Sequence, residues 1–212
     1  MSPAGLPVLW ADEQLIAVDK PAGMLSVPGR GPERADCAAS RVQAVWPDAL
    51  IVHRLDMGTS GVLVFGRGPE AQRRLSAAFA ERRVDKRYLA IVAGVPTAHT
   101  GTVELPLICD WPNRPRQMVD FERGKPSTTH WRVLQPAADG ATARLELIPF
   151  TGRSHQLRVH MQAIGHPIVG DELYAPAEVL AMSPRLLLHA ECLTLPHPAG
   201  ESALTLRAPC PF

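Results

Sequence analysis

The chain has 212 residues, of which 46% are hydrophobic and 20% are charged, and its formal net charge is +1 at pH 7. A chain of this length and composition can bury a core without disulfides or a structural metal. Its near-neutral charge excludes a uniformly basic coat, so any surface for nucleic acid must be a local patch.

Short strands alternate with a few helices in the predicted order of elements, and glycine or proline marks most of the turns. Residues 15–18 are apolar and β-prone and predict a strand, and residues 20–23 (KPAG) predict a turn into residues 24–27. Asp36 is a candidate N-cap for a helix that ends near Trp46, where the following proline stops it.

The rest of the chain is predicted to contain two longer helices among several strands. One helix covers residues 69–83, with a proline in its first turn and with Leu75 and Ala78 on its apolar face. The other begins near Ser154 and is ended by Gly165, with apolar residues at helical spacing between them. Strands are predicted at residues 61–65, 88–92, 127–134, 143–148 and 186–195.

No internal repeat, low-complexity tract or linker divides this pattern. We therefore predict a single α+β domain over residues 1–212, built on a mixed, mostly antiparallel central sheet flanked by helices and loops.

The cysteines and the N-terminus bear on the setting of the protein. Four cysteines lie far apart, without a CxxC pair or a Cys/His cluster at zinc spacing. The N-terminus has no charged segment followed by an apolar one, and no apolar run approaches the length of a membrane span. The expected setting is reducing and cytoplasmic, with no membrane contact.

The most informative segment is residues 53–61 (HRLDMGTSG), directly before the strand predicted at residues 61–65. Asp56 lies there in a tight, glycine-containing loop, which can hold a side chain rigidly while the backbone stays close to a ligand. Most aspartates in such loops only cap a turn. This segment alone therefore leaves a catalytic and a structural role for Asp56 open.

Residues 53–61 resemble the HRLDxxTSG signature of the RluA family of pseudouridine synthases, in which the aspartate is catalytic. Further stretches resemble the family's other motifs, in the family's order. They are residues 19–23 (DKPAG, with Asp19 where asparagine is usual), 86–88 (KRY), 151–160 (TGRSHQLRVH) and 166–171 (HPIVGD). Residues 105–115 and 185–190 are similar to the smallest branch of the family, which lacks a preceding S4-type RNA-binding domain and acts on 23S rRNA and a tRNA anticodon stem-loop.

The resemblance implies roles for three residues. Asp56 is the catalytic group, Tyr88 stacks on the target uracil, and Arg153 pairs with Asp56. A nearby cation keeps a carboxylate charged in a partly buried pocket, which is a physical reason for such a pair. Without the motifs, a tyrosine in a strand would be expected in the core, and the arginine would be expected to bind a carboxylate or carbonyl for structure.

The implied reaction breaks the bond from ribose C1′ to uracil N1, turns the base, and joins C1′ to C5. It involves no redox change and no group donor, so no cofactor is expected, and the sequence carries neither a GxGxxG nor a Walker A motif. His155 and His160 have no third ligand nearby, so no metal site is expected. The carboxylate can attack covalently or remove the C2′ proton to give a glycal, and the sequence leaves both routes open.

The expected partners are 23S rRNA and tRNA, bound by a monomer without an obligate protein partner. The target nucleotide must flip out of its stack. The resemblance implies that Arg54 helps to fill the vacated space, and His53 and Thr59 are predicted to lie at the RNA, with His53 ordering the loop. Residues 67–87 carry seven basic residues against three acidic ones and are the candidate surface for the RNA backbone. Its predicted contacts are Arg73, Arg82, Arg83 and Lys86.

Two other readings of the same residues compete with this one. An RNA-binding module that has lost catalysis is disfavoured because Asp56, Tyr88 and Arg153 are all present. A glycoside or nucleoside hydrolase would use a second carboxylate to protonate the leaving group, and no motif supplies one for Asp56.

Overall fold

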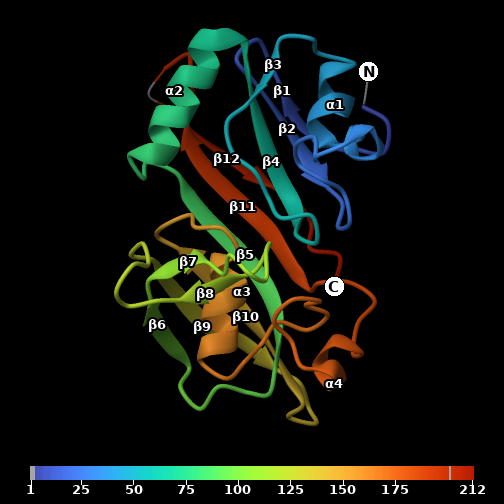
Figure 1. Ribbon diagram of the computed structural model, residues 1–212. Coiled ribbons are helices and arrows are strands. Elements are labelled where there is room, and N and C mark those ends of the chain that lie inside the picture. The colour runs from blue at the N-terminus through green and yellow to red at the C-terminus, as the bar shows by residue number, and fades with distance from the viewer. Residues whose placement is uncertain (1–2, 201) are drawn as a thin grey trace. The chain divides into compact units, whose positions relative to one another are not determined.

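The structure, a computed structural model, describes residues 3–200 and 202–212. Its internal contacts divide the chain into two compact units (Figure 1). Unit 1 consists of Met1–Lys86 with His189–Pro211, and unit 2 consists of Arg87–Leu188 with Phe212. The chain passes from one unit to the other within β5 (Asp85–Ala93) and β11 (Leu188–Pro196), and again between Pro211 and Phe212. Within the described ranges, no helix is both long enough and apolar enough to cross a membrane.

Unit 1 contains a mostly antiparallel sheet. Besides β11, its strands are β1 (Val8–Ala11), β2 (Leu15–Lys20), β3 (Ala49–Ile51), β4 (Ser60–Arg67) and β12 (Ala203–Arg207). The order is β1-β2-β4-β11, with β12 paired to β11 and β3 paired to β4. The pairing of β4 with β11 is parallel and the others are antiparallel, so the sheet is mixed as predicted.

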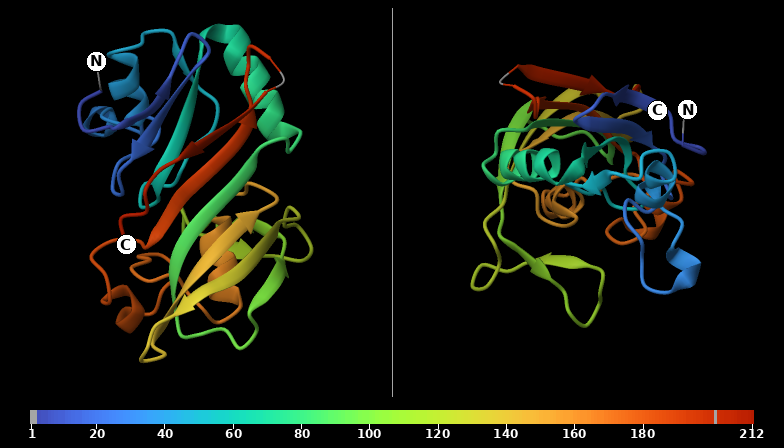
Figure 2. Two further views of the ribbon diagram at one scale, coloured as in Figure 1. Left: turned by 180° about the vertical axis from the view of Figure 1, so that it is seen from behind. Right: turned by 90° about the horizontal axis from the view of Figure 1, so that it is seen from above.

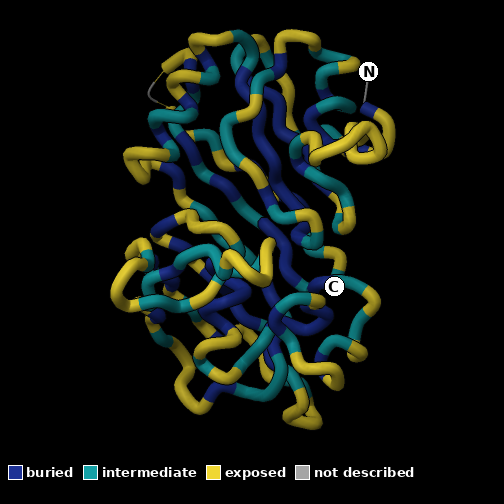
Figure 3. The backbone as a smooth tube through the Cα atoms, viewed as in Figure 1, coloured by how far each residue is buried: buried dark blue, intermediate teal, exposed yellow. Residues whose placement is uncertain are grey.

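Two helices, α1 (Ala38–Gln43) and α2 (Gly68–Ala80), lie on the same face of this sheet (Figure 2). Leu75 and Ala78 of α2 are buried against Val62 and Val64 of β4, which confirms the apolar face predicted for this helix. Burial runs along nearly the whole of β2 and β4 (Figure 3). The apolar runs LIAV in β2 and GVLVF in β4 are typical of strands that are covered on both faces.

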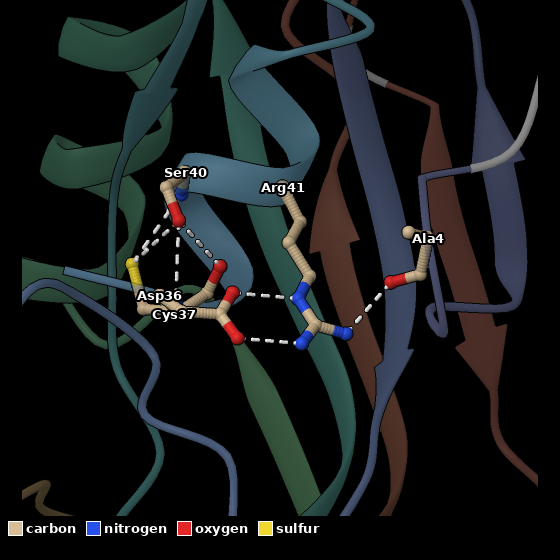
Figure 4. Close-up of polar contacts among 5 residues, drawn as sticks. All are labelled: Ala4, Asp36, Cys37, Ser40 and Arg41. Carbon is tan, nitrogen blue, oxygen red and sulfur yellow. Dashed lines mark hydrogen bonds and ion pairs between the residues drawn. The ribbon is translucent and has the colours of Figure 1, made fainter. Parts of the chain in front are cut away.

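The start of α1 differs from the prediction, because Cys37 rather than Asp36 is the N-cap. The Cys37 sulfur accepts a hydrogen bond from the Ser40 N–H at 3.3 Å, and the Ser40 hydroxyl oxygen accepts one from the Cys37 N–H at 3.0 Å. Asp36 instead receives two hydrogen bonds from Arg41, whose guanidinium also donates to the carbonyl of Ala4 (Figure 4). This charge-assisted pair holds the Asp36 carboxylate on the arginine and leaves the cap to the next residue.

Unit 2 contains a set of antiparallel sheet strands and most of the remaining elements. Besides β5, its strands are β6 (Thr100–Glu104), β9 (Thr128–Pro136) and β10 (Thr142–Pro149), in the antiparallel order β5-β10-β9-β6. The helix α3 (Gln156–Ala163) covers one face of this sheet, as the view from behind in Figure 2 shows. A separate hairpin pairs β7 (Leu107–Cys109) with β8 (Gln117–Val119), and a short helix, α4 (Ala177–Leu180), follows later.

The core of unit 2 forms between α3 and its sheet. Leu157 and Met161 of α3 pack with Leu145 and Leu147 of β10 and with Val92 of β5. These residues include the apolar positions at helical spacing from which the second helix was predicted. The helix begins two residues later than predicted and ends before Gly165.

Candidate active site

The loop of residues 53–59 in unit 1 carries Asp56 and joins β3 to β4. The Thr59 N–H donates to the carbonyl of Asp56 at 3.1 Å and closes a turn, and Asp56 itself is half-buried. Thr59 is only 2% exposed. Its burial suits a role in shaping this turn better than the direct RNA contact predicted for it.

A serine and a glycine from the preceding loop fix the backbone on both sides of Asp56. The Ser26 hydroxyl donates to the carbonyl of Leu55 at 2.7 Å and accepts from the Leu55 N–H at 3.0 Å. The Gly23 N–H donates to the carbonyl of Met57 at 2.8 Å. The carboxylate therefore projects from a backbone that is held in place at both neighbours.

Lys20 lies completely buried beside these contacts. Its ammonium group donates to the carbonyls of Pro21 at 2.9 Å, Met24 at 2.7 Å and Met57 at 3.2 Å. A buried ammonium is costly unless it is hydrogen-bonded, and three carbonyls meet the capacity of its three protons. The KPAG motif thus supports the Asp56 loop, a role that the sequence pattern did not reveal.

The end of the motif is fixed by a buried histidine and by close backbone packing. The Ser60 hydroxyl lies 2.8 Å from Nδ1 of His189, and Nε2 of His189 lies 3.1 Å from the carbonyl of Ala208. Gly61 has φ 111°, and a Cβ at this position would overlap the carbonyl oxygen of Ala190 in β11. Glycine is required here because a side chain would separate the parallel pair β4 and β11.

His53 is held inside unit 1 as a neutral ring. The Val64 N–H donates to Nε2 of His53 at 3.0 Å, and the ring stacks on Phe79 with centroids 4.6 Å apart. Burial, together with the charge of Lys86, lowers the pKa of His53 from 6.5 to about 3. These contacts agree with the loop-ordering role expected for His53.

The pH dependence of stability tests this assignment. Because the folded-state pKa of His53 lies below 6.5, the unfolded chain takes up the proton more readily. The stabilisation from the neutral ring is complete above about pH 6.5 and is lost as the pH falls toward the folded pKa. At about pH 5.5 the loss of unfolding free energy amounts to about 1 kcal/mol. We expect His53→Gln, which keeps a hydrogen-bond acceptor, to lose less unfolding free energy between neutral pH and about pH 5.5 than wild type. Urea unfolding at both pH values measures this, and parallel losses in the two proteins would contradict the assignment.

Unit 2 carries the other two predicted catalytic residues. Tyr88 lies in β5 opposite Leu147 of β10 and packs, half-buried, against the core of unit 2. Arg153 is exposed in the segment between β10 and α3, and its Nε donates to the carbonyl of Pro126 at 3.3 Å. The guanidinium therefore makes a weak contact within unit 2, at the long end of the range for hydrogen bonds.

A buried glutamine fixes the backbone around Arg153. The side-chain carbonyl of Gln156 accepts from the Arg153 N–H at 3.0 Å and from the Thr151 hydroxyl at 2.7 Å. Its amide donates to the carbonyl of Thr128 at 2.9 Å. The TGRSHQ motif thus builds a rigid turn from which a long cationic side chain reaches solvent.

The basic residues of unit 1 that are predicted to contact RNA differ in whether a carboxylate pairs with them. Arg54 is exposed and makes no hydrogen bond or ion pair with any residue that the structure describes. Arg73 is paired with Glu70 at 2.8 Å and Arg83 with Glu81 at 2.8 Å. Several other arginines of the predicted basic surface are paired as well: Arg67 with Asp48, Arg74 with Glu70 and Arg87 with Glu146.

Surface ion pairs of this kind are weak, so phosphate could replace the carboxylates. The pairing nevertheless makes the surface of residues 67–87 less positive than its composition implies. Burial lowers the pKa of Lys86, with a smaller contribution from Arg82. Lys86 is therefore less suited to phosphate than an exposed lysine.

The β7–β8 hairpin of unit 2 is an aromatic and cationic surface that was not predicted. Trp111 is 67% exposed, and the Arg114 guanidinium lies 4.0 Å from the centre of its ring. Phe121, just beyond the hairpin, is 75% exposed. Exposed aromatic rings with stacked arginines suit unpaired RNA bases and the adjoining phosphates. The sequence WPNRPR places a tryptophan beside two arginines, which is the signal from which this surface could have been found.

A cavity of about 450 Å³ borders the Asp56 loop in unit 1. Met57 contributes to its wall, whereas Asp56 does not. The other lining residues are Pro21, Ala22, Gly23, Met24, Leu25, Glu33, Arg34, Asp36 and Arg41. The cavity is large enough for a nucleotide-sized group, but its charged walls are mixed in sign. No group of three or more His, Cys, Asp or Glu side chains that could hold a metal ion occurs in the described part of the chain.

Comparisons with known proteins give a consistent result. A family model described as RNA pseudouridylate synthase matches residues 14–163. The chain is 54% identical over 207 residues to the dual-specificity RNA pseudouridine synthase RluA of Escherichia coli strain K12, which covers 98% of this chain and 94% of that protein. The RluA protein of Vibrio cholerae is 48% identical, with 98% and 84% covered. The solved structure of human RNA pseudouridylate synthase domain containing 1 is similar with a TM-score of 0.82 and 28% identity, over 100% of this chain and 87% of that one.

Proposed function

The chain belongs to the RNA pseudouridylate synthase family, and we propose that it converts uridine to pseudouridine in stem-loops of both 23S rRNA and a tRNA anticodon arm. The observation that carries the dual substrate is the match over nearly the whole chain to relatives named dual-specificity RNA pseudouridine synthase. A similar stem-loop in two RNA classes could be recognised by shape and by splayed bases.

Asp56 is proposed to be the catalytic group. The reaction breaks C1′–N1, forms C1′–C5, releases the proton from C5, and places a proton on N1. An ionised carboxylate can serve it by attacking C1′ or by taking the C2′ proton, and both routes require a fixed side chain. The support within unit 1 is the set of contacts from Lys20, Ser26 and Gly23 that hold the backbone on either side of Asp56.

Tyr88 and Arg153 are proposed to act in the same reaction. A tyrosine ring offers a flat surface for a flipped uracil. An arginine can stabilise a carboxylate in its charged form, and the guanidinium of Arg153 makes a weak contact with the carbonyl of Pro126. The rigid turn around Gln156 supports such a positioning task.

RNA binding is proposed to use Arg54 and the β7–β8 hairpin together with residues 67–87. Arg54 has an exposed planar guanidinium, which can take the place of a flipped base. Trp111 with Arg114 can stack on unpaired bases.

Release of tritium from RNA labelled at uridine C5 tests the function, because that hydrogen leaves only when C1′ joins C5. The purified protein is incubated with a stem-loop of 23S rRNA and with a tRNA anticodon stem-loop. Control stem-loops carry cytidine in place of the loop uridines. We expect release from both uridine-containing RNAs and from neither control. Release from one class alone would contradict dual specificity, and release from neither would contradict the function.

A further inference from the structure

Tyr174 is a buried tyrosine of unit 2 whose hydroxyl joins two segments far apart in sequence. It is 3% exposed and packs with Leu107 of β7 and Val159 of α3. Its hydroxyl oxygen accepts from the Gln117 N–H at 2.7 Å and lies 2.7 Å from Nδ1 of His155. The oxygen accepts from Gln117, which leaves the hydroxyl proton for an unprotonated Nδ1.

Tyr174 is itself held in place by a buried ion pair. Asp171 accepts two hydrogen bonds from Arg158, at 2.8 and 2.6 Å, and also accepts from the N–H groups of Leu173 and Tyr174. The side chains of Arg158 and Asp171 are 8% and 0% exposed. Bidentate pairing fixes both distance and angle, so the tyrosine is attached firmly to α3.

His155 is the point at which Tyr174 acts on the Arg153 segment. It has φ 53°, a left-handed conformation that costs a residue other than glycine about 1 kcal/mol and persists only where surrounding contacts enforce it. Besides the hydrogen bond, the rings of His155 and Tyr174 meet edge to face with centroids 5.6 Å apart. The turn that points Arg153 outward is therefore fixed from one side by Gln156 and from the other by Tyr174.

The second bond of the hydroxyl reaches the base of the β7–β8 hairpin. Gln117 is the first residue of β8, and its N–H points at Tyr174. One oxygen atom thus ties the hairpin that carries Trp111 and Arg114 to the turn that carries Arg153.

We propose that Tyr174 is a positioning residue for the reaction: its hydroxyl holds the Arg153 turn and the base of the β7–β8 hairpin in one fixed arrangement. The inference rests on the proposed role of Arg153. Its consequence is that the chemical step depends on Tyr174 although the residue acts through His155 rather than on substrate. We expect RNA affinity to change little when the hydroxyl is removed, because the exposed hairpin side chains remain.

Tyr174→Phe tests the inference by removing one oxygen and keeping the ring. We expect the single-turnover rate of pseudouridine formation to fall about tenfold at saturating enzyme, with the RNA dissociation constant within about twofold of wild type. Hydrogen exchange should become faster at the Gln117 amide. In an Arg153→Lys background, where the guanidinium is already lost, Tyr174→Phe should lower the single-turnover rate by about threefold or less. Val133→Ala, a buried apolar change in β9, serves as the control for lost stability and should leave the rate unchanged.

Each outcome bears on the inference. A Tyr174→Phe variant as fast as wild type would overturn it while leaving the proposed function intact, and so would a loss confined to RNA affinity or an equal loss in the Arg153→Lys background. A wild-type protein without activity would overturn the proposed function and this role with it. Should Tyr174→Phe fail to fold, His155→Asn repeats the test, since asparagine tolerates the left-handed backbone and removes the ring.

Discussion

Replacing Asp56 by asparagine is expected to abolish pseudouridine formation while leaving the fold and most of the RNA affinity intact. The amide keeps the shape of the carboxylate but can neither attack C1′ nor take a proton, and losing such a group costs at least about 10²–10⁴-fold in rate. The contacts that fix the loop go to backbone atoms of the neighbouring residues Leu55 and Met57. The loop should therefore keep its form.

Single-turnover tritium release, with circular dichroism for the fold and filter binding for affinity, measures this result. Asp48→Asn is the matched control, because it removes a carboxylate from unit 1 that is paired with Arg67 on the surface. Its rate should stay within about twofold of wild type, since surface pairs contribute little. An Asp56→Asn enzyme within tenfold of wild type would refute the catalytic assignment.

The long, regular elements could be predicted from the sequence because their patterns are local. The apolar run GVLVF predicted β4, and the spacing of Leu157 and Met161 predicted α3, since burial on one face imposes a period that survives in the sequence. The helix predicted over residues 69–83 occurs as Gly68–Ala80. The helix expected to end near Trp46 ends at Gln43, a boundary that depends on caps rather than on period.

The short strands could not be predicted from the sequence, because they are too short to show a pattern. Strands such as β3, β7 and β8 have three residues each, too few to show an alternation, and they form because a partner strand is already in place. The cap at Cys37 was missed because Asp36 is the better N-cap by propensity, and its pairing with Arg41 is not visible in a local pattern.

In the candidate site, too, local motifs could be recognised from the sequence, whereas contacts between distant residues could not. The motifs singled out Asp56, but they did not reveal that Lys20 would be buried against the carbonyl of Met57 or that Ser26 would bracket Leu55. These contacts join residues about thirty or more positions apart, and no local pattern specifies them. The count of arginines in residues 67–87 likewise overstated the available charge, because Asp48 and Glu146 come from other parts of the chain.

Replacing Arg153 by methionine is expected to remove activity nearly as completely as the loss of Asp56. Methionine matches much of the length of the side chain and removes its charge, while the turn keeps its shape because Gln156 binds the Arg153 N–H rather than its guanidinium. A carboxylate that loses its proposed cation in a partly dry site becomes protonated or draws in water. Either change removes a competent nucleophile or base.

Arg153→Lys separates charge from shape. Lysine keeps the positive charge and loses the planar fork, so its rate should lie between those of the methionine variant and wild type. The comparison is single-turnover kinetics on an anticodon stem-loop, with Arg123→Met as the control, because Arg123 is an exposed arginine of the same unit paired with Asp120. The order wild type, Lys, Met supports electrostatic action by the guanidinium. Equal, severe losses of rate in both variants would show that the reaction requires the planar fork and that a positive charge alone is not sufficient. A folded methionine variant at near wild-type speed would make Arg153 a structural residue bound to Pro126, and Asp56 would then keep its charge without it.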